Sequence, residues 1–322
     1  IGKFGIESNG RLQVEKEAET LAAMFDHFDN FEHWGVSGPN GYFVDQPDGT
    51  RKHLTDITGE KAIRFLRNHH HRHRDQPFCL SISFNAPHAQ DNDPRQYIWP
   101  PGVDHLYEDV TVPVPELADS KYFEALPGFL QASEGRRRWA KRFDTPEKVQ
   151  RMMKGMYRMV SGVDAVIGLL LAELQRLGVS ENTVVIFMSD NGMFFGERGL
   201  SDCWLLYEDS IRVPMIIADP RQPDERRGIT ADQFVLNIDV SPTVLDLAGV
   251  TVPSKIQGRS LVPLVEGKSP EWRTEFFCEH LLTFPELRIP KSEGVRTERW
   301  KYIRYFEQQP VHEELYDLAK DP

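Results

Sequence analysis

The chain has 322 residues, of which 40% are hydrophobic and 27% are charged, so it can bury a core and is not disordered by composition. A formal net charge of −11 argues against non-specific binding to nucleic acid or to anionic membranes. Three cysteines exclude a scaffold built on disulfides and a zinc site of four cysteines. The longest uninterrupted apolar runs, such as residues 184–188, are too short to span a bilayer.

The sequence at both ends of the chain is typical of the interior of a domain rather than of a natural terminus. The first residue is Ile1 rather than Met, and the chain ends at Pro322 without a tapering tail. We therefore expect further sequence before Ile1, and we draw no conclusion from the lack of a targeting segment.

The N-terminal third predicts short elements separated by loops. Residues 15–28 are charged and rich in alanine, which favours a helix, whereas residues 35–49 are rich in proline and glycine and predict a loop. Residues 58–68 have the apolar spacing of a short amphipathic helix. Residues 78–84, Phe-Cys-Leu-Ser-Ile-Ser-Phe, predict a strand, and the proline-rich residues 91–135 predict a long excursion over the surface or over a pocket.

The strongest helix signal begins at Thr145. Thr145 suits the N-cap, Pro146 suits the first helical position, and Glu147 favours the positive end of the helix dipole. Apolar residues then recur at helical spacing as far as Leu177, and Gly178 ends the pattern. This stripe, which includes several methionines, predicts a core helix that packs on a sheet rather than a cofactor contact.

Apolar strands and helices alternate after this helix. Residues 182–189 form a continuous apolar strand of the kind that a parallel sheet buries on both faces, and residues 213–218 form another. Residues 239–248 predict a short helix. This alternation predicts an α/β fold in which helices sandwich a mixed, mostly parallel sheet.

The pattern changes after Gly267. Residues 275–280 and 294–306 predict strands of an antiparallel sheet, the second turning at Glu298-Arg299. We therefore divide the chain into a large α/β domain, residues 1–267, and a small C-terminal α+β subdomain, residues 268–322.

Polar side chains follow two of the predicted strands, at the sheet edge where ligands of open α/β folds bind. Asp190 and Asn191 come directly after the strand that ends at Ser189, and their oxygens suit a hard cation such as Ca²⁺ or Mg²⁺. His88 follows the other strand and can donate to an anion or protonate a leaving group. Each signal alone fits a common turn or a structural histidine, and their occurrence together strengthens the functional interpretation.

Three further cationic features allow a structural or a functional interpretation. Lys3, in Gly2-Lys3-Phe4-Gly5, can reach an oxyanion, although on sequence alone a solvated surface lysine is the simpler interpretation. The run His69-His70-His71-Arg72-His73 is interpreted as a solvated helix end, because consecutive helical positions point in different directions. The run Arg136-Arg137-Arg138 is interpreted as an exposed face.

Four segments together resemble the type I sulfatases of the alkaline phosphatase superfamily. They are residues 78–88, 157–192, 196–220 and 237–261, and SEGVRTERWKYIRYF and ELYDLAKDP look like the family's C-terminal region. The resemblance implies an alkaline phosphatase-like fold and hydrolysis of sulfate esters at a Ca²⁺ ion, with Mg²⁺ as the alternative. It also implies a periplasmic or secreted protein and a formylglycine nucleophile made in a Cys/Ser-x-Pro-x-Arg motif.

The resemblance implies roles for individual residues. Asp190 and Asn191 match two metal ligands of the family. His88 matches the histidine that binds sulfate and serves the leaving group, and Lys3 matches the lysine that contacts the sulfate and the nucleophile. His88 and Lys3 are therefore the catalytic candidates, and with Arg198 they are the substrate-binding candidates.

The sequence also departs from the family pattern. It contains no Cys/Ser-x-Pro-x-Arg motif, which the family places, with two more metal-binding aspartates, before the position of Ile1. Gly5 stands where many members have a histidine, and Cys203 stands where many have a second sulfate-binding lysine. That change removes a positive charge from the anion pocket, and we expect Arg198, nearby in sequence, to replace part of it.

Three functions stay open at this point. The first is a calcium-dependent sulfuric ester hydrolase acting on a sulfated carbohydrate or an aryl sulfate. The second is a phosphate or phosphonate ester hydrolase of the same superfamily, which an unmodified upstream Ser or Thr would favour. The third is a non-catalytic member that binds carbohydrate or a partner, which Gly5 and Cys203 favour. We expect this chain alone to hydrolyse no aryl sulfate, because the nucleophile motif is absent from it.

Overall fold

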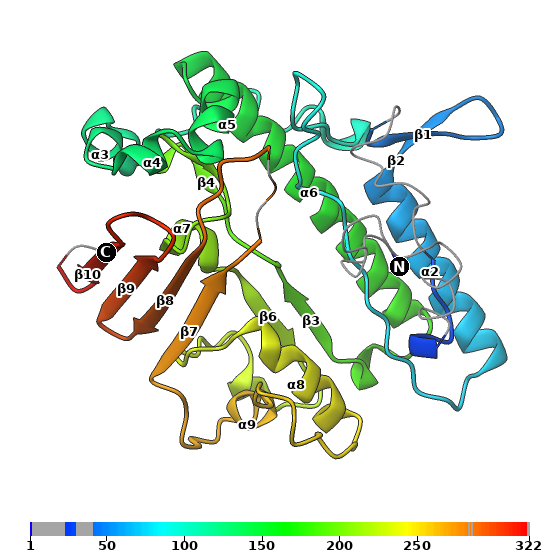
Figure 1. Cartoon of the computed structure of the whole chain (residues 1–322). Helices are drawn as coiled ribbons and strands as arrows, with labels where there is room; N and C mark the ends of the chain where they lie inside the picture. The colour runs from blue at the N-terminus through cyan, green and yellow to red at the C-terminus, as the bar shows by residue number, and fades with distance from the viewer. Residues whose placement is uncertain (2–22, 30–40, 283, 285, 321–322) are drawn as a thin grey trace. The chain divides into compact units, whose positions relative to one another are not determined.

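The computed structural model describes residues 1, 23–29, 41–282, 284 and 286–320 (Figure 1). The chain divides into two compact units, each built from two separate stretches. The first unit comprises Ile1–Pro113 and Thr145–Glu181, and the second comprises Val114–Asp144 and Asn182–Pro322. The boundary predicted at residue 267 stays a prediction.

Helix α6, Pro146–Arg176, confirms the strongest helix prediction in the first unit. The hydroxyl of Thr145 accepts a hydrogen bond from the backbone N–H of Lys148 at 3.3 Å, so the N-cap is the predicted one. By length and composition α6 could also cross a membrane, which is weak evidence because core helices of water-soluble proteins pass the same test. Its buried positions include Val149, Met152, Met153, Gly155, Met159, Gly162, Val163, Val166, Leu170, Glu173 and Leu174.

Helix α2, Leu54–Arg72, packs against α6 within the first unit (Figure 1). It extends beyond the predicted range 58–68 because His53 caps its start, its Nδ1 accepting from the N–H of Thr55 at 3.2 Å. The histidine run ends the helix, as predicted. The two helices approach closely at Gly59, where an added Cβ would lie 2.5 Å from a methyl carbon of Val166.

Two extended segments of the first unit differ from their predictions. Part of the predicted loop 35–49 belongs to an antiparallel hairpin of β1, Phe43–Asp45, and β2, Arg51–His53. The predicted strand 78–84 is not assigned as a strand within the described part of the chain. Its backbone instead pairs with the first residue, because Ser83 donates to the carbonyl of Ile1 and the amino group of Ile1 donates to the carbonyl of Ser81, both at 2.9 Å.

A four-stranded antiparallel sheet, in the order β10–β9–β8–β7, organises the second unit (Figure 1). Its strands are β7, Glu275–His280; β8, Ser292–Thr297; β9, Trp300–Tyr305; and β10, His312–Asp317. The predicted strands and the turn between β8 and β9 are therefore confirmed. The core cluster of this unit consists of Leu130, Phe194, Leu200, Leu205, Leu206, Tyr207, Ile303 and Tyr305.

The strand that leads to the candidate metal ligands is less buried than expected. Strand β3, Val185–Met188, pairs with β6, Met215–Ala218, in antiparallel register. The predicted parallel pairing and burial on both faces are wrong for the described residues, because Phe187 is 39% exposed and Ile216 is 60% exposed. An apolar run indicates a strand but carries no information about the direction of its neighbour.

Short elements complete the two units. The helix predicted at 239–248 is confirmed as α8, Val240–Leu247. The other short helices and strands of the second unit are α3, Ser120–Glu124; α4, Gly128–Gln131; α5, Glu134–Arg142; β4, Phe194–Phe195; β5, Ser201–Asp202; α7, Glu208–Ile211; and α9, Val262–Val265. The 3₁₀ turns include Pro101–Val103, Glu116–Ala118, Glu197–Gly199, Asp224–Arg226 and Asn237–Asp239.

Candidate functional site

The predicted metal ligands lie on an exposed loop at the end of β3. The N–H of Asn191 donates to Oδ1 of Asp190 at 2.9 Å, and the side-chain amide of Asn191 donates to the carbonyl of Gly192 at 2.7 Å. These bonds use one carboxylate oxygen of Asp190 and one side-chain N–H of Asn191, and among the described residues they leave the other carboxylate oxygen and the amide oxygen as acceptors. Both oxygens suit a hard cation.

The same loop provides only part of a metal site. Ca²⁺ takes about six to eight oxygen ligands, whereas Asp190 and Asn191 supply two. The part of the chain that the structure describes contains no group of three or more His, Cys, Asp or Glu side chains placed to hold a metal. The two oxygens therefore fit part of a calcium site, and a complete site would need ligands from other groups.

Hydrogen bonds to its backbone fix this loop from two sides within the second unit. On one side, the N–H of Gly192 donates to the carbonyl of Ser210 at 2.7 Å. A Cβ at Gly192 would lie 2.2 Å from the backbone oxygen of Asp209, so only glycine allows this approach to α7. On the other side, the side-chain amide of Asn237 donates to the carbonyl of Asp190 at 3.1 Å.

Asn237 was not predicted as a site residue, and its position depends on a buried ion pair. Asp239, two residues later, is fully buried and accepts hydrogen bonds from both terminal nitrogens of Arg273, at 2.5 and 2.7 Å. It also accepts from the backbone N–H of Arg259 at 2.8 Å. This network holds the 3₁₀ turn that carries Asn237.

Arg198, a predicted substrate-binding residue, has a guanidinium group with no hydrogen-bond partner among the described residues, and its Nε is buried. Its Cζ lies 4.9 Å from the ring centroid of Tyr207. The backbone of Arg198 is left-handed, with φ of 54°, a conformation that non-glycine residues rarely adopt outside turns and functional sites. Among the described residues, the Arg198 guanidinium thus contacts an aromatic ring, and its Nε has no hydrogen-bond partner.

Two carboxyl groups lie close enough to Arg198 to feel its charge. Burial raises the pKa of Glu197, and burial also raises the pKa of Asp209, while the charge of Arg198 partly opposes both shifts. Both carboxyl groups therefore lie within electrostatic range of the Arg198 guanidinium.

Cys203, which the sequence resemblance places at a lysine position of the family, is a neutral thiol. Burial, together with the charges of Asp202 and Asp190, raises its pKa to about 12. The preceding residue, Asp202, has a left-handed backbone with φ of 92°. Cys203 therefore supplies neither a cation nor a thiolate at neutral pH.

The arginine run of α5 forms the predicted exposed face only in part, at Arg137, whose side chain is 66% exposed. Arg138 pairs with Asp202 at 3.0 Å and with Glu134 at 2.8 Å, and its side chain is only 14% exposed. Arg142, outside the predicted run, is fully buried and contacts Asp202 at 3.2 Å. Arg136 lies between the rings of Phe123 and Trp139, 3.7 Å from each centroid. Arg138 departs from the predicted exposed face because the carboxylates of Glu134 and Asp202 compensate its charge.

His88 lies on an exposed loop of the first unit. Its Nδ1 is 2.7 Å from the carbonyl of Ala89, and because a carbonyl only accepts, this contact places the proton on Nδ1 and orients the ring. The hydroxyl of Tyr42 donates to the carbonyls of Asn85 at 2.9 Å and His88 at 2.6 Å. Buried Tyr42 therefore holds the loop backbone, a role that sequence reasoning missed.

The predicted site residues do not all lie in one compact unit. Asp190, Asn191 and Arg198 lie in the second unit, whereas His88 lies in the first. Lys3 and Gly5 lie outside the described residues. The predicted convergence of these side chains on one ion therefore stays a prediction.

Comparisons with known families agree along most of the chain. A family model described as Sulfatase matches residues 14–250. A second, described as N-sulphoglucosamine sulphohydrolase, C-terminal, matches residues 196–322. The two matches together run from residue 14 to the end of the chain.

Curated relatives are similar in sequence but longer. An N-acetylglucosamine-6-O-sulfatase of Bacteroides thetaiotaomicron is 30% identical over 365 residues, covering 91% of this chain and 62% of the relative. A choline-sulfatase of Rhizobium meliloti is 31% identical, covering 83% of this chain and 49% of the relative. An arylsulfatase of Clostridium perfringens is 28% identical, covering 87% and 55%. The chain thus spans about half to three fifths of the length of these relatives.

Solved structures confirm the predicted fold class. A protein solved in complex with its substrate D-glucosamine-2-N,6-O-disulfate superposes with a TM-score of 0.68 and 26% identity, covering 89% of this chain and 69% of that chain. A phosphonate monoester hydrolase from Silicibacter pomeroyi superposes with a TM-score of 0.68 and 20% identity, covering 94% and 62%, which shows the shared fold alone.

Proposed function

Because the chain belongs to the sulfatase family of the alkaline phosphatase superfamily, we propose that it forms part of a sulfuric ester hydrolase acting on sulfated carbohydrate. The observation that carries this proposal is the loop after β3. Asp190 and Asn191 there offer two hard oxygen ligands to solvent, and Gly192 and Asn237 fix the loop that carries them.

Asp190 and Asn191 would hold a Ca²⁺ ion, with Mg²⁺ as the alternative. Bound there, the ion would supply positive charge that polarises the sulfate oxygens. Arg198 would hold a sulfate oxygen, a role supported by its Nε, which has no hydrogen-bond partner among the described residues. Lys3 would contribute a second cation by its resemblance to the family lysine.

His88 would serve the leaving group. With the proton on Nδ1 directed at Ala89, the neutral ring has its lone pair on Nε2. When that nitrogen is protonated, the imidazolium can bind the sulfate and return the proton to the departing oxygen. The formylglycine nucleophile, further metal ligands and export to the periplasm or cell exterior are expected from the family.

A phosphate or phosphonate ester hydrolase remains the second candidate. The superposition on phosphonate monoester hydrolases supports it, since the same fold serves that reaction. Sulfate and phosphate esters both need a cation and an anion pocket, so Asp190, Asn191 and Arg198 do not separate the two. A comparison of activity on sulfate and phosphate esters must therefore distinguish the two functions.

The test is sulfate release by the purified native protein. Glucosamine 6-sulfate and 4-nitrophenyl sulfate would be compared with 4-nitrophenyl phosphate, with released anion measured by ion chromatography. We expect sulfate release, and a fall of about 10²- to 10⁴-fold in the His88→Ala variant, the usual contribution of a general acid or base. His105→Ala, another exposed histidine of the first unit, is the matched control.

The possible outcomes separate the candidates. Release of phosphate without sulfate would replace the sulfatase proposal by the phosphatase one. Release of neither anion by a protein that still binds Ca²⁺ would indicate a non-catalytic member. Equal losses in His88→Ala and His105→Ala would remove His88 from the mechanism.

A further inference from the structure

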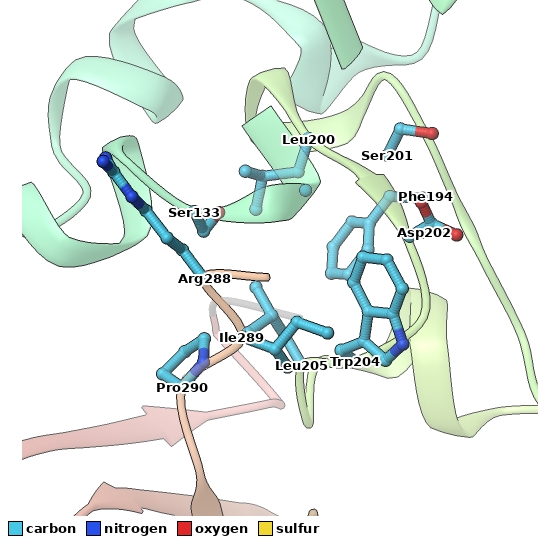
Figure 2. A pocket seen from close by; sticks show the side chains of 11 residues that line it. Ser133, Phe194, Leu200, Ser201, Asp202, Trp204, Leu205, Arg288, Ile289 and Pro290 are labelled. Atoms are coloured by element: carbon cyan, nitrogen blue, oxygen red, sulfur yellow. The ribbon is translucent and has the colours of Figure 1, made fainter. Parts of the chain in front are cut away.

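The hollow at the start of α5 is too small to bind an organic ligand (Figure 2). Its lining includes Ser133, Asp202 and Trp204, and its accessible space holds about one water molecule. A stronger candidate for ligand binding lies at the end of α2, in the first unit. There the fold brings together two histidines of the run His69-His70-His71-Arg72-His73.

His69 and His73 lie on one face of the end of α2. Consecutive positions of a helix point in different directions, but positions four apart lie one above the other. The backbone N–H of His73 donates to the carbonyl of His69 at 2.7 Å, so the helical turn between them is complete, and their ring centroids are 5.6 Å apart. Two histidines at this spacing on one helix face are an arrangement by which helices bind a divalent metal.

A hydrogen bond fixes the tautomer of His69. Its Nε2 lies 2.9 Å from the backbone carbonyl of Gln76. Because a carbonyl only accepts, Nε2 carries the proton and Nδ1 keeps the lone pair. Metal-binding histidines usually donate their other ring N–H to a carbonyl or carboxylate, which orients the ring and makes the ligating nitrogen more basic. His69 is therefore held in the form that a metal ion requires.

Two aromatic rings hold the imidazole of His69 in place. It stacks on Phe65, one turn earlier in α2, with centroids 5.8 Å apart and planes inclined by 22°. It also meets Phe78, beyond the end of the helix, at 5.5 Å and 69°. A side chain already ordered by its neighbours loses little conformational entropy when it binds an ion.

The electrostatic setting at the end of α2 is mixed. The negative end of the helix dipole favours a cation beside His69 and His73. The guanidinium groups of Arg72 and Arg74 oppose it, but both side chains are exposed, so water and salt screen their charge. His73 is exposed as well, so an ion can reach it from solvent and water can complete the coordination.

We propose that His69 and His73 form a site for a divalent transition metal that prefers imidazole nitrogen, namely Zn²⁺, Ni²⁺ or Cu²⁺. Ca²⁺ prefers oxygen ligands and should not bind there. The inference therefore does not rest on the proposed function or on the ion expected at Asp190. Because the ring of His69 contacts Gln76 and Phe78, the bound ion would strengthen the connection between α2 and residues 78–84.

The experiment is titration calorimetry of the purified native protein with Zn²⁺, in excess Ca²⁺ so that oxygen sites are occupied. We expect His69→Ala and His73→Ala each to raise the dissociation constant for Zn²⁺ at least about tenfold, since loss of a mere hydrogen-bonding partner of a ligand already costs about 10- to 100-fold. His71→Ala is the matched control, because His71 is an exposed histidine of the same run that points in another direction. It should leave the dissociation constant unchanged.

Two further variants keep the proposal testable. His73→Ala removes an exposed side chain, so it tests the site even if His69→Ala disturbs the contacts with Phe65 and Phe78. Asp190→Asn should bind Zn²⁺ as the wild type does. No Zn²⁺ binding by the wild type, unchanged binding in His73→Ala, or an equal loss in His71→Ala would overturn the site. A loss of binding in Asp190→Asn alone would place the ion at the loop after β3 and also overturn it.

Discussion

Single residues hold the candidate metal loop after β3 in place within the second unit. Gly192 is the most constrained of them. Its N–H is bonded to the carbonyl of Ser210, and the space above its Cα is filled by the backbone oxygen of Asp209. A backbone atom cannot move aside as the end of a flexible side chain can. Any side chain at this position must therefore displace the loop that carries Asp190 and Asn191, or α7, or both.

We expect Gly192→Ala to lower the free energy of unfolding by about 1–3 kcal/mol, as overpacked positions do. The added Cβ would lie 2.2 Å from the oxygen of Asp209, which requires a backbone shift. Urea unfolding measures this change. Gly128→Ala in α4, where a Cβ meets nothing within 4 Å, is the control. A variant as stable as the control would show that the loop yields without strain.

Asn237 shows which part of the site the sequence could not reveal. Asp190 and Asn191 could be proposed from the sequence because they directly follow an apolar strand. The amide of Asn237 reaches the carbonyl of Asp190 across 47 positions of the chain. No local pattern states which distant carbonyl a side-chain amide will bind, so this support became visible only in the structure.

At the scale of whole elements, local sequence patterns predicted helices and a hairpin, but they did not predict the direction in which distant strands pair. Helix α6 carries its own cap and apolar stripe, and β8 and β9 are joined by a short turn, so each was predictable. The direction of β3 against β6 depends on a partner some 30 residues away, and the apolar runs of the two strands do not encode it. Residues 78–84 form a related case, because their backbone pairs with Ile1.

The contact between α2 and α6 includes a carboxylate shared by two arginines. Glu173 of α6 is 5% exposed and accepts hydrogen bonds from Arg176 of the same helix and from Arg67 of α2. The hydrogen bonds from Arg176, and then those from Arg67, lower the pKa of Glu173 to about 2. Glu173 therefore ties the two helices together while it is ionised.

We expect Glu173→Gln to lower the free energy of unfolding at pH 7 by about 1 kcal/mol, the upper end for partly exposed ion pairs. The melting temperature should fall accordingly. The folded-state pKa lies below its ordinary value of 4.5, so this stabilisation is present above pH 4.5 and is lost as the pH falls through about 2. Melting curves of both proteins from pH 7 downward should therefore converge. Glu181→Gln, an exposed carboxyl of the same unit, is the control, and a constant difference down to low pH would contradict the assignment.

At the scale of the whole molecule, the sequence predicted the family and the fold class, and the two compact units became visible in the structure. Residues 114–144 leave the first unit to complete the second, and residues 145–181 return to the first. Strands β7–β10 lie in the same compact unit as residues 182–267, and the subdomain boundary predicted at residue 267 stays a prediction. Compactness depends on long-range contacts, which a linear pattern does not contain.

A bound cation would stabilise the folded protein as a whole, because Asp190 and Asn191 offer it oxygen ligands only when the loop after β3 is formed. We expect Ca²⁺ at about 100 times its dissociation constant to add about 2.7 kcal/mol to the free energy of unfolding, and a chelator to remove that gain. Asp190→Asn removes the charged ligand and should abolish most of the response. Differential scanning calorimetry with and without Ca²⁺ measures it.

The control for the calcium response is Asp224→Asn, which changes a carboxylate that is 86% exposed and lies in a 3₁₀ turn of the same unit. It carries the same change in net charge as Asp190→Asn, so a difference between the two variants isolates ligation from general electrostatics. Mg²⁺ should stabilise less than Ca²⁺, because it demands stricter octahedral geometry. An equal response in both variants would place the ion elsewhere, and no response in the wild type would remove calcium from the proposed reaction.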